Sequence, residues 1–462
     1  MKGCFGGRVQ GRGPSGYGTA ANNRRSGLAL SEQQGSPIVT PWGRASELKT
    51  RKLVPGSGTP REEVLRNQRE RLLAAVVAVA SERGFEATTV AQVLDLCGIS
   101  RSDFYKHFAN KGDCLTQAAE ALLEPTVREL QEVRRSSDAD APEAVFLRFL
   151  ELVAAQPAAA RACFVELHAI GEAGEAVADR CFKSFFELVG ELDPELPGRQ
   201  LPSALTRILV SGLSKVIHTR LYRRQEGELA RLGPELWKWL ISVAAPPSAL
   251  EAPRRQRSSG GPRFAGYTPA ERIAQAVATV VAEKGFGAMN TDDIAARAAI
   301  SLSTFYEHFA DKRDAVLAAI EMSGAQMMAS AVPAARRADN WQDGVRALYE
   351  AMCAYFVAEP AMAQLATVGV YEAGPQALSR RDRVIDSLAE MLAPGFEENP
   401  AAPAAAAEAV AATAYALIRE QMRTKGAQSL SSVVPLATYV TLVGFVGPDR
   451  ACAVANGVAR RR

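Results

Sequence analysis

Apolar residues recur with helical spacing along most of this chain. The first clear stripe begins after Glu62 and ends at Gly84, a residue type that commonly follows the last turn of a helix. Its apolar positions are Leu65, Leu72, Leu73, Val76 and Ala80. This pattern predicts one amphipathic helix that turns its apolar face to a core.

Two shorter helices are predicted after the first. Thr89 followed by Gln92 has the pattern of a capping box, and the helix that it starts ends at a tight turn containing Gly98. Ser100, with Asp103 three residues later, has the same pattern and starts the next helix. Two short helices joined by a glycine turn form a helix-turn-helix.

The second of these short helices has two different faces. Phe104 and Phe108 are one turn apart and share a buried face, which leaves Ser102 and Lys106 on the opposite, polar face. Asn110 and Asp113, in turn, are spaced to cap the following helix, and this places Lys111 in its first turn. Free N–H groups and a cation at a helix start both suit a phosphate.

The chain repeats this pattern 201 positions later. Residues 299–312 match residues 98–111 without an insertion or a deletion, and 17 of 43 aligned positions are identical between 72–114 and 273–315. The similarity extends beyond this region, because Pro234 lies 201 residues before Pro435. The whole unit is therefore duplicated.

The remainder of each unit also reads as helical. No stretch alternates like a strand, so the sequence predicts an all-α fold. In the first unit, amphipathic segments are predicted at about 142–155, 157–170, 174–192, 202–223 and 229–244. In the second, they are predicted at about 313–330, 341–358, 360–370, 375–392, 404–424 and 430–446.

Residues 1–60 differ from the rest in composition. They are rich in Gly, Ser, Pro and Arg, and they hold nine Lys or Arg against two Glu. Such a segment is predicted to be disordered. The favoured interpretation is an unstructured extension or a misassigned start codon. The alternative is a basic arm that lies on DNA. Residues 246–266 have the turn-forming and charged composition of a linker.

These boundaries divide the chain into seven parts. The predicted parts are a basic extension (1–60), a first helix-turn-helix head (61–111), a first helical body (112–245), a linker (246–266), a second head (267–312), a second body (313–450) and a C-terminal tail (451–462).

Composition excludes several other classes of protein. At 462 residues and 47% hydrophobic content, the chain can bury substantial cores. No phosphate loop, nucleophile elbow or metal-ligand spacing is found, so neither an enzyme nor a metal site is expected. Seven scattered cysteines predict mostly reduced, buried thiols. No uninterrupted run of about 18 apolar residues is present, so we expect no membrane span and a cytoplasmic, nucleoid-associated location.

The motif order resembles that of the TetR family of bacterial regulators. The resemblance is carried by Gly84-Phe85, Thr89-Val90, Gly98-Ile99-Ser100, Phe104-Tyr105-Lys106-His107-Phe108 and Asn110-Lys111, and in the second copy by Gly285-Phe286, Asn290, Ile300-Ser301, Phe305-Tyr306, His308-Phe309 and Asp311-Lys312. It implies a three-helix head and a helical effector and dimerisation body in each unit. Members usually form homodimers through their last two helices, here about 202–244 and 404–446, and the fusion makes an intramolecular pseudo-dimer a second option.

The resemblance also implies which residues contact double-stranded DNA. Tyr105, His107 and Lys111 match phosphate-contacting positions, and the helix-packing alternative stays open for both His107 and His308. Base contacts are expected from Arg101, Ser102 and Lys106, because these side chains donate hydrogen bonds to base edges. Two roles are open for Asp103: its carboxylate caps the helix, or it accepts a hydrogen bond from the amino group of a cytosine. The remaining expected DNA contacts are Thr89, Asn290, Ser303, Thr304, Tyr306, His308 and Lys312.

The second head departs from the first at three positions. Ala299 replaces the turn glycine, Leu302 stands where the first copy has an arginine, and Glu307 replaces a lysine. A carboxylate at that position faces the negative charge of a duplex. We therefore expect the second head to bind DNA more weakly or to read a different half-site.

Aromatic residues at helical spacing mark the bodies. Most of them are expected in the core, and the family resemblance makes a cavity for a small apolar effector plausible. The candidate contacts of that effector are Phe164, His168, Phe186, Tyr355 and Tyr371. The sequence thus predicts a DNA-binding transcription regulator, a ligand-responsive repressor without a cofactor. The alternative is a protein-interaction module in which one or both heads no longer bind DNA.

Overall fold

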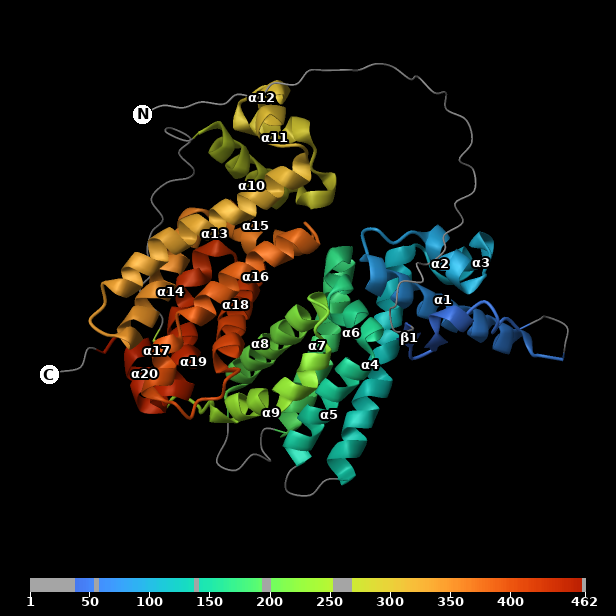
Figure 1. Ribbon diagram of the computed structural model, residues 1–462, viewed down its shortest axis with the longest axis horizontal. Coiled ribbons are helices and arrows are strands. Elements are labelled where there is room, and N and C mark those ends of the chain that lie inside the picture. The colour runs from blue at the N-terminus through green and yellow to red at the C-terminus, as the bar shows by residue number, and fades with distance from the viewer. Residues whose placement is uncertain (1–37, 54–57, 137–140, 193–200, 252–267, 459–462) are drawn as a thin grey trace, which may run out of the picture. The chain divides into compact units, whose positions relative to one another are not determined.

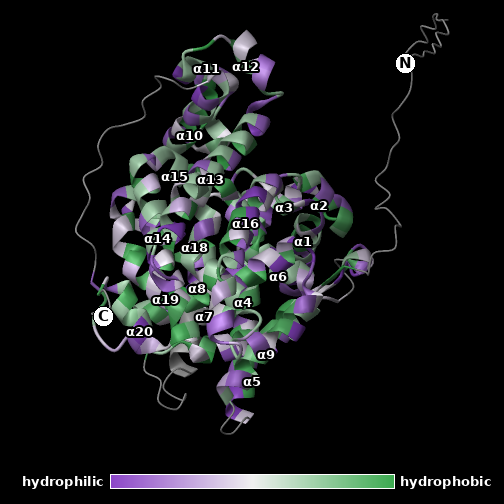
Figure 2. Ribbon diagram, turned by 60° about the vertical axis from the view of Figure 1, so that its left-hand side comes forward, coloured by the Kyte–Doolittle hydropathy of each residue, from purple (hydrophilic) through white to green (hydrophobic). Residues whose placement is uncertain are grey.

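The structure is a computed structural model that describes residues 38–53, 58–136, 141–192, 201–251 and 268–458. These residues are helical almost throughout, which confirms the predicted all-α class (Figure 1). Most helices carry hydrophobic and hydrophilic residues together, as amphipathic packing requires (Figure 2). The six cysteines among the described residues are unpaired, and four of them are buried.

The first unit consists of a head and a body. Its head contains α1 (Arg61–Arg83), α2 (Val90–Cys97) and α3 (Arg101–His107). Its body contains α4 (Lys111–Ser136), α5 (Ala141–Ala155), α6 (Pro157–Phe164), the 3₁₀ turn η2 (Glu166–Ile170), α7 (Glu172–Leu192), α8 (Ser203–Tyr222) and α9 (Gly227–Ser242).

The second unit repeats this order. Its head contains α10 (Pro269–Ala288), which kinks at Gly285, α11 (Thr291–Ala298) and α12 (Leu302–His308). Its body contains α13 (Lys312–Arg336), α14 (Trp341–Ala358), α15 (Pro360–Thr367), η4 (Gly369–Tyr371), α16 (Pro375–Glu390), α17 (Ala393–Glu398), α18 (Ala406–Lys425), η5 (Ala427–Val433), α19 (Val434–Val446) and α20 (Pro448–Ala455).

The predicted C-terminal tail and the start of the predicted linker both differ from the sequence prediction. Residues 451–462 were expected to form a tail, but α20 continues to Ala455 and buries Ala451 and Cys452 against the body core. The start of the expected linker is also tied to α20. The Glu251 N–H donates to Asn456 Oδ1 at 2.8 Å, and Asn456 Nδ2 donates to the Ala249 carbonyl at 3.0 Å. The rest of that linker, from residue 252 to residue 267, lies outside the described residues.

The expectation that residues 1–60 are disordered is wrong for residues 38–53. There, β1 (Val39–Thr40) pairs antiparallel with β2 (Gly43–Arg44), and η1 (Ala45–Glu47) follows. The side chain of Leu48 is fully buried in the core of the first head. Residues 1–37, which the same prediction covers, lie outside the described residues.

Arg71 of α1 attaches this N-terminal segment to the head. Its side chain is only 2% exposed, its Nε donates to the Leu48 carbonyl at 2.7 Å, and its Nη2 donates to the Cys97 carbonyl at the end of α2. On the surface beside it, Lys49 forms an ion pair with Asp95 of α2 at 3.2 Å. Sequence periodicity missed these contacts because they join residues more than twenty positions apart.

The bodies of the two units share one hydrophobic core. This core includes Leu213 and Trp239 of the first unit together with Tyr349 and Leu442 of the second. Separate clusters fill the first head, around Leu72 and Phe104, and the second head together with the neighbouring part of its body. The bodies are therefore packed against each other as parts of one interior.

The closest approach between the units is at α8 and α18, which lie side by side (Figure 1). A Cβ atom added to Gly212 of α8 would lie 1.9 Å from Oγ1 of Thr413 in α18. The two positions are 201 residues apart and so are equivalent in the repeat. Only glycine permits this contact, because any side chain at position 212 would overlap Thr413.

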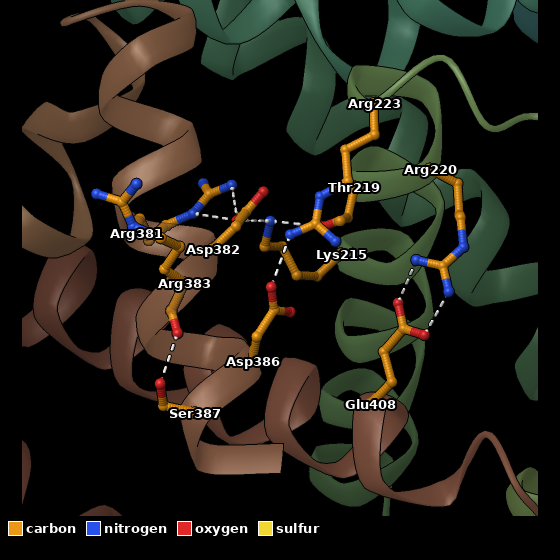
Figure 3. A network of polar contacts seen from close by, with 10 residues as sticks. All are labelled: Lys215, Thr219, Arg220, Arg223, Arg381, Asp382, Arg383, Asp386, Ser387 and Glu408. Atoms are coloured by element: carbon orange, nitrogen blue, oxygen red, sulfur yellow. Dashed lines mark hydrogen bonds and ion pairs between the residues drawn. The ribbon is translucent and has the colours of Figure 1, made fainter. Parts of the chain in front are cut away.

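Buried and half-buried ion pairs connect α8 with α16 and with α18 (Figure 3). Lys215 Nζ donates to Asp382 Oδ1 of α16 at 2.9 Å, and Arg381 donates to the same oxygen at 2.9 and 2.6 Å. Arg220 binds Glu408 through two parallel hydrogen bonds of 2.7 and 2.6 Å. Buried charges are tolerated when they are paired in this way.

Two helical stretches among the described residues are long and apolar enough to cross a membrane by length and composition, Lys312–Arg336 and Ala427–Val446. Within the fold, 44% and 67% of their most apolar windows are buried. The second stretch combines η5 and α19, whose residues belong to the shared core. Packing between helices accounts for its hydrophobicity.

The hydrogen bonds from Arg71 to the carbonyls of Leu48 and Cys97 lead to a stability prediction. Arg71→Ala would leave the carbonyls of Leu48 and Cys97 without this donor inside the head, which should destabilise the first head by about 2–3 kcal/mol. The matched control is Arg272→Ala at the equivalent, half-buried position of the second unit. Hydrogen exchange of α2 amides measures the effect, and equal protection in the two variants would contradict the structural role of Arg71.

Candidate nucleic-acid interface

Both helices of the first helix-turn-helix are capped as the sequence predicts. The Gln92 N–H donates to Thr89 Oγ1 at 3.3 Å and the Thr89 N–H donates to Gln92 Oε1 at 2.8 Å, which completes the capping box of α2. Gly98 ends α2 in the left-handed conformation at φ 65°. The Asp103 N–H donates to Ser100 Oγ at 3.1 Å and so starts α3. The turn between the helices is thus built from local contacts.

The two faces of α3 are separated as predicted. Phe104 and Phe108 are buried with ring centroids 5.7 Å apart, so they hold the helix against the head. Arg101, Ser102 and Lys106 are exposed on the other side. Tyr105 is also exposed, at 48%, and its ring contacts Phe104 edge-on at 5.2 Å. The outer face therefore presents donors on a fixed support.

Asp103 has two partners within its own helix. Ser100 Oγ donates to Asp103 Oδ2 at 2.7 Å, and Lys106 Nζ donates to Oδ1 at 2.8 Å. These two hydrogen bonds, that from Lys106 first, hold the pKa of the Asp103 carboxyl below its usual range. A complete capping box would also need the Asp103 carboxylate to accept a hydrogen bond from the Ser100 N–H. The carboxylate instead accepts from the Ser100 hydroxyl, so only the half of the box made by the Asp103 N–H is formed. The local role of Asp103 explains it without a base contact.

Lys111, one of the expected phosphate contacts, is hydrogen-bonded within the head. Its Nζ donates to the carbonyls of Phe85 and Thr88 at 2.8 Å each and to that of Glu86 at 3.3 Å. An ammonium has three N–H donors, so these three carbonyls occupy all of them. The ammonium also lies over the Phe85 ring, 4.3 Å from its centroid. Lys111 closes the loop between α1 and α2 onto α4.

Lys312 has the matching role in the second head. Its Nζ donates to the Met289 carbonyl at 2.8 Å and lies 5.2 Å from the centroid of the Phe286 ring. The repeated lysine therefore has a structural function in both units. Sequence spacing could not distinguish this function from a phosphate contact, because the carbonyls are 23 to 26 residues away in the chain.

The two candidate histidines have different surroundings. The ring of His107 is half-buried beside Phe108, 6.1 Å between centroids, and its Nε2 has no hydrogen-bond partner among the described residues. Burial and the nearby Arg69 lower the pKa of His107. These features favour the packing role for His107. His308, by contrast, is exposed on α12.

The second head has the same scaffold with a different outer face. Asn290 and Asp293 form the capping box of α11, and Ser301 caps α12. Ser303 and Glu307 are exposed on α12, as are Leu302 at 40% and Tyr306 at 56%. Thr304 is half-buried, with its Oγ1 3.0 Å from Ser301 Oγ. In place of the basic face of α3, this surface has apolar and acidic groups.

Only three of the five candidate effector contacts are found in the lining of a cavity. Phe164 and His168 line a cavity in the first body, and Tyr371 lines the same cavity from the second unit. Tyr355 is outside its lining and donates through its hydroxyl to Gln326 Oε1 at 3.0 Å. The side chain of Phe186 lies outside the described residues. No group of three or more His, Cys, Asp or Glu among the described residues could hold a metal ion.

Comparison with known families identifies the repeated head. The family described as bacterial regulatory proteins, tetR family, matches residues 72–118 and again residues 273–319. The two matches cover equivalent parts of the two heads, from α1 into α4 and from α10 into α13. The chain carries two TetR-type heads in tandem. Its two helix-turn-helix units are those that the repeat in the sequence predicts.

Individual relatives of this chain are distant. An uncharacterized helix-turn-helix transcriptional regulator, YerO of Bacillus subtilis (strain 168), is 26% identical over 81 residues, which are 18% of this chain. The match spans only 28% of that relative's length.

Three solved structures each match about two fifths of this chain. The fatty acid degradation regulator FadR of Bacillus halodurans is 16% identical, with 39% of this chain and 96% of that chain covered and a TM-score of 0.35. A TetR family regulator of Marinobacter aquaeolei is 17% identical, with 37% and 94% covered and a TM-score of 0.31. The TetR family regulator PfmR of Thermus thermophilus is 18% identical, with 39% and 100% covered and a TM-score of 0.30.

The turn residues of the two heads lead to opposite stability predictions. Ala299 is left-handed at φ 53° like Gly98 at φ 65°, a conformation that costs an alanine about 1–2 kcal/mol. Ala299→Gly should therefore stabilise the second head by about 0.5–1 kcal/mol, after allowing for the greater freedom of glycine in the unfolded chain. Gly98→Ala should destabilise the first head, because its Cβ would also lie 3.3 Å from Lys49 Cγ.

Native-state hydrogen exchange of amides in α2 and α11 measures the two changes separately. Each variant is the control for the other, because each alters one head only. If the hydrogen-exchange protection of the altered head fell in both variants, the inferred backbone strain at Ala299 would be contradicted.

Proposed function

We propose that this protein is a DNA-binding transcription regulator that acts as a ligand-responsive repressor and reads double-stranded DNA mainly through the first head. The observation that carries the proposal is the outer face of α3. Arg101, Ser102 and Lys106 are exposed on a helix whose inner face is fixed by two buried phenylalanines. A recognition helix needs such a fixed support, because base contacts depend on side-chain position.

The exposed groups suit the chemistry of the major groove. Arginine and lysine donate to the O6 and N7 atoms of guanine, and serine bonds to several base edges. Tyr105 and Thr89, at the start of α2, are exposed, and we assign them to phosphate oxygens, which accept hydrogen bonds from hydroxyl and N–H groups. A duplex partner also supports a cytoplasmic, nucleoid-associated location.

The second head supports a weaker or different contact. Glu307 would face phosphate charge where the first head has Lys106, and Leu302 replaces a guanidinium. The exposed side chain of Leu302 instead suits a contact with protein. Loss of DNA binding by this head, with a role in protein interaction, is the second candidate function.

We further propose that the two units pair with each other inside one chain, as a pseudo-dimer through α8, α9, α18 and α19. Charge complementarity at Arg220 supports this pairing. Arg220 meets Glu408, and the position in the first unit equivalent to Glu408 is Arg207. A symmetric pair of first units would therefore place Arg220 against Arg207 twice, a like-charge contact that opposes such a dimer.

Buried charges favour the same conclusion. Lys215 and Asp382 form an ion pair with side chains 6% and 2% exposed. From the Gly174 and Gly374 alignment, the first-unit position equivalent to Asp382 is Phe182. A pair of first units would bury Lys215 without its carboxylate, which costs several kcal/mol. The expected operator is consequently asymmetric, with its stronger half-site read by the first head.

DNA binding is tested by titrating the full chain with genomic or randomised duplex DNA at several salt concentrations. Binding should weaken steeply with salt, and Arg101→Ala should relax preference at one base position by about 1–3 kcal/mol. The matched control is Leu302→Ala in the second head, which should leave base preference at the stronger half-site unchanged. Salt-insensitive binding, or none to any fragment, would favour the interaction module.

Pairing of the units is tested by exchanging the charges of Arg220 and Glu408. Arg220→Glu and Glu408→Arg should each lower the free energy of unfolding by about 1–3 kcal/mol, because each places like charges together. The double exchange should restore the part of the loss that belongs to the pair with Glu408, but not the part due to Glu228, which lies 3.1 Å from Arg220 Nε. Chemical unfolding gives the energies, and the mass in solution gives the assembly.

A monomeric mass with an asymmetric footprint is the expected result for the parent chain. A dimer of chains on a perfect palindrome, together with no rescue in the double variant, would show that pairing occurs between chains. Arg128 and Glu124, which form an exposed pair within α4, provide a control exchange that should change neither mass nor stability appreciably.

A further inference from the structure

A cavity of about 530 Å³ lies in the body of the first unit, and the second unit forms part of its wall. Its volume is within the range of small-molecule sites. The apolar part of the wall includes Leu122, Leu123, Val127, Leu130, Phe149 and Phe164. From the second unit come Tyr371 after α15 and Tyr415 and Arg419 of α18. The cavity is thus completed only when the two units are packed together.

The polar residues of the wall form one cluster. The rings of His168 and His218 are 6.2 Å apart, and each is close to Tyr371, at 5.1 and 5.9 Å. The guanidinium of Arg419 lies 4.4 Å from the centroid of the Tyr371 ring. Lys215 precedes His218 by three residues on α8, so it borders the same cluster. An apolar chamber with polar groups gathered at one place suits an amphipathic molecule.

His218 has no partner in this cluster. Its side chain is 4% exposed, and neither Nδ1 nor Nε2 has a hydrogen-bond partner among the described residues. Burial first, and then the charge of Lys215, hold the pKa of His218 well below its usual range, so the ring is neutral. A neutral imidazole offers one N–H donor and one acceptor. A buried ring with neither group satisfied indicates a missing polar partner.

The buried charges around His218 do not balance. Lys215 and Arg381 share the single carboxylate of Asp382, whereas Arg419 donates to Glu175 Oε1 at 2.8 Å. Three cations therefore face two carboxylates, and His168 donates to Glu175 without adding a negative charge. Burial, with the charge of Arg381, lowers the pKa of Lys215 to about 7. The other charged residues of the wall that are exposed, such as Lys183 and Glu187, are compensated by solvent.

We propose that this cavity binds an amphipathic monoanion, an apolar or aromatic body with one carboxylate that accepts hydrogen bonds from His218 and lies beside Lys215 and Arg419. The carboxylate balances the excess buried cation, and the body fills the apolar chamber. Because Arg419 and Tyr371 belong to the second unit, the bound molecule contacts both units at once. This inference rests on the proposed ligand-responsive function, and it concerns binding alone.

Three compounds of one shape and different charge test the proposal: 4-pentylbenzoate, 4-pentylbenzamide and 4-pentylbenzamidine. Each has 14 heavy atoms, which at about 30 Å³ per atom occupy roughly 420 Å³, so each fits the cavity. Calorimetric titration of the full chain without DNA gives the three affinities. The carboxylate should bind about tenfold more tightly than the neutral amide, and the cationic amidine should bind more weakly than both.

Two variants locate the carboxylate. Lys215→Met removes the excess cation while Asp382 keeps both hydrogen bonds from Arg381, so the carboxylate should lose its advantage over the amide. His218→Phe, similar in shape but without ring nitrogens, should weaken carboxylate binding several-fold. Lys183→Met, at an exposed lysine of the same wall, is the matched control and should change nothing.

Equal affinities for the three compounds, a preference for the amidine, or no binding by any of them would overturn the proposal. The series on the parent chain decides this even if a variant fails to fold. DNA binding is measured separately without ligand, so the two proposals fail separately. Carboxylate binding by a chain that binds no DNA would refute only the regulator function, and DNA binding without carboxylate selectivity would refute only this inference.

Discussion

The contact between α8 and α18 is the constraint on which the rest of the structure depends. Gly212 allows the backbone of α8 to reach Thr413 closely enough that no side chain fits between them. Three residues further along α8, Lys215 forms an ion pair with Asp382 of α16, and both side chains are buried. A buried ion pair is stable only while its geometry is kept, because either charge alone would carry the full cost of desolvation. The first contact thus holds α8 against α18, and the second holds the same helix against α16.

The cavity depends on the same contact. It lies in the first body, yet Tyr371 and Arg419 of the second unit line it. Separation of α8 from α18 would open the chamber and expose His218 and Lys215 to solvent. Movement at the boundary and occupancy of the cavity are consequently linked, since a molecule that binds the packed arrangement stabilises it by mass action.

The two heads show how one scaffold carries different surfaces. In each, a phenylalanine pair fixes the recognition-type helix and a lysine closes the preceding loop through backbone carbonyls. The outward residues differ, with Arg101 and Lys106 in the first head and Leu302 and Glu307 in the second. The first head alone is packed against a described N-terminal segment, through Arg71 and Leu48. Stability and recognition are thus assigned to different residues of the same short helices.

The sequence by itself determined the features that depend on neighbours within a few positions. The capping box at Thr89, the glycine turn at Gly98 and the helix that starts after Ser100 all follow from contacts three or four residues apart, and the structure has each of them. The duplication and the all-α class are visible in the same way, because spacing and periodicity are local properties.

Only the tertiary structure decided the roles that depend on distant residues. Lys111 has the position of a phosphate contact in the sequence, but its acceptors lie more than twenty residues earlier in the chain. Residues 38–53 lack a helical or strand pattern, yet they fold because Arg71 and the head core bind them. The cavity combines side chains from both units, and no local pattern encodes such a combination. The sequence specifies the chemistry of each side chain, whereas tertiary packing determines which groups that side chain contacts.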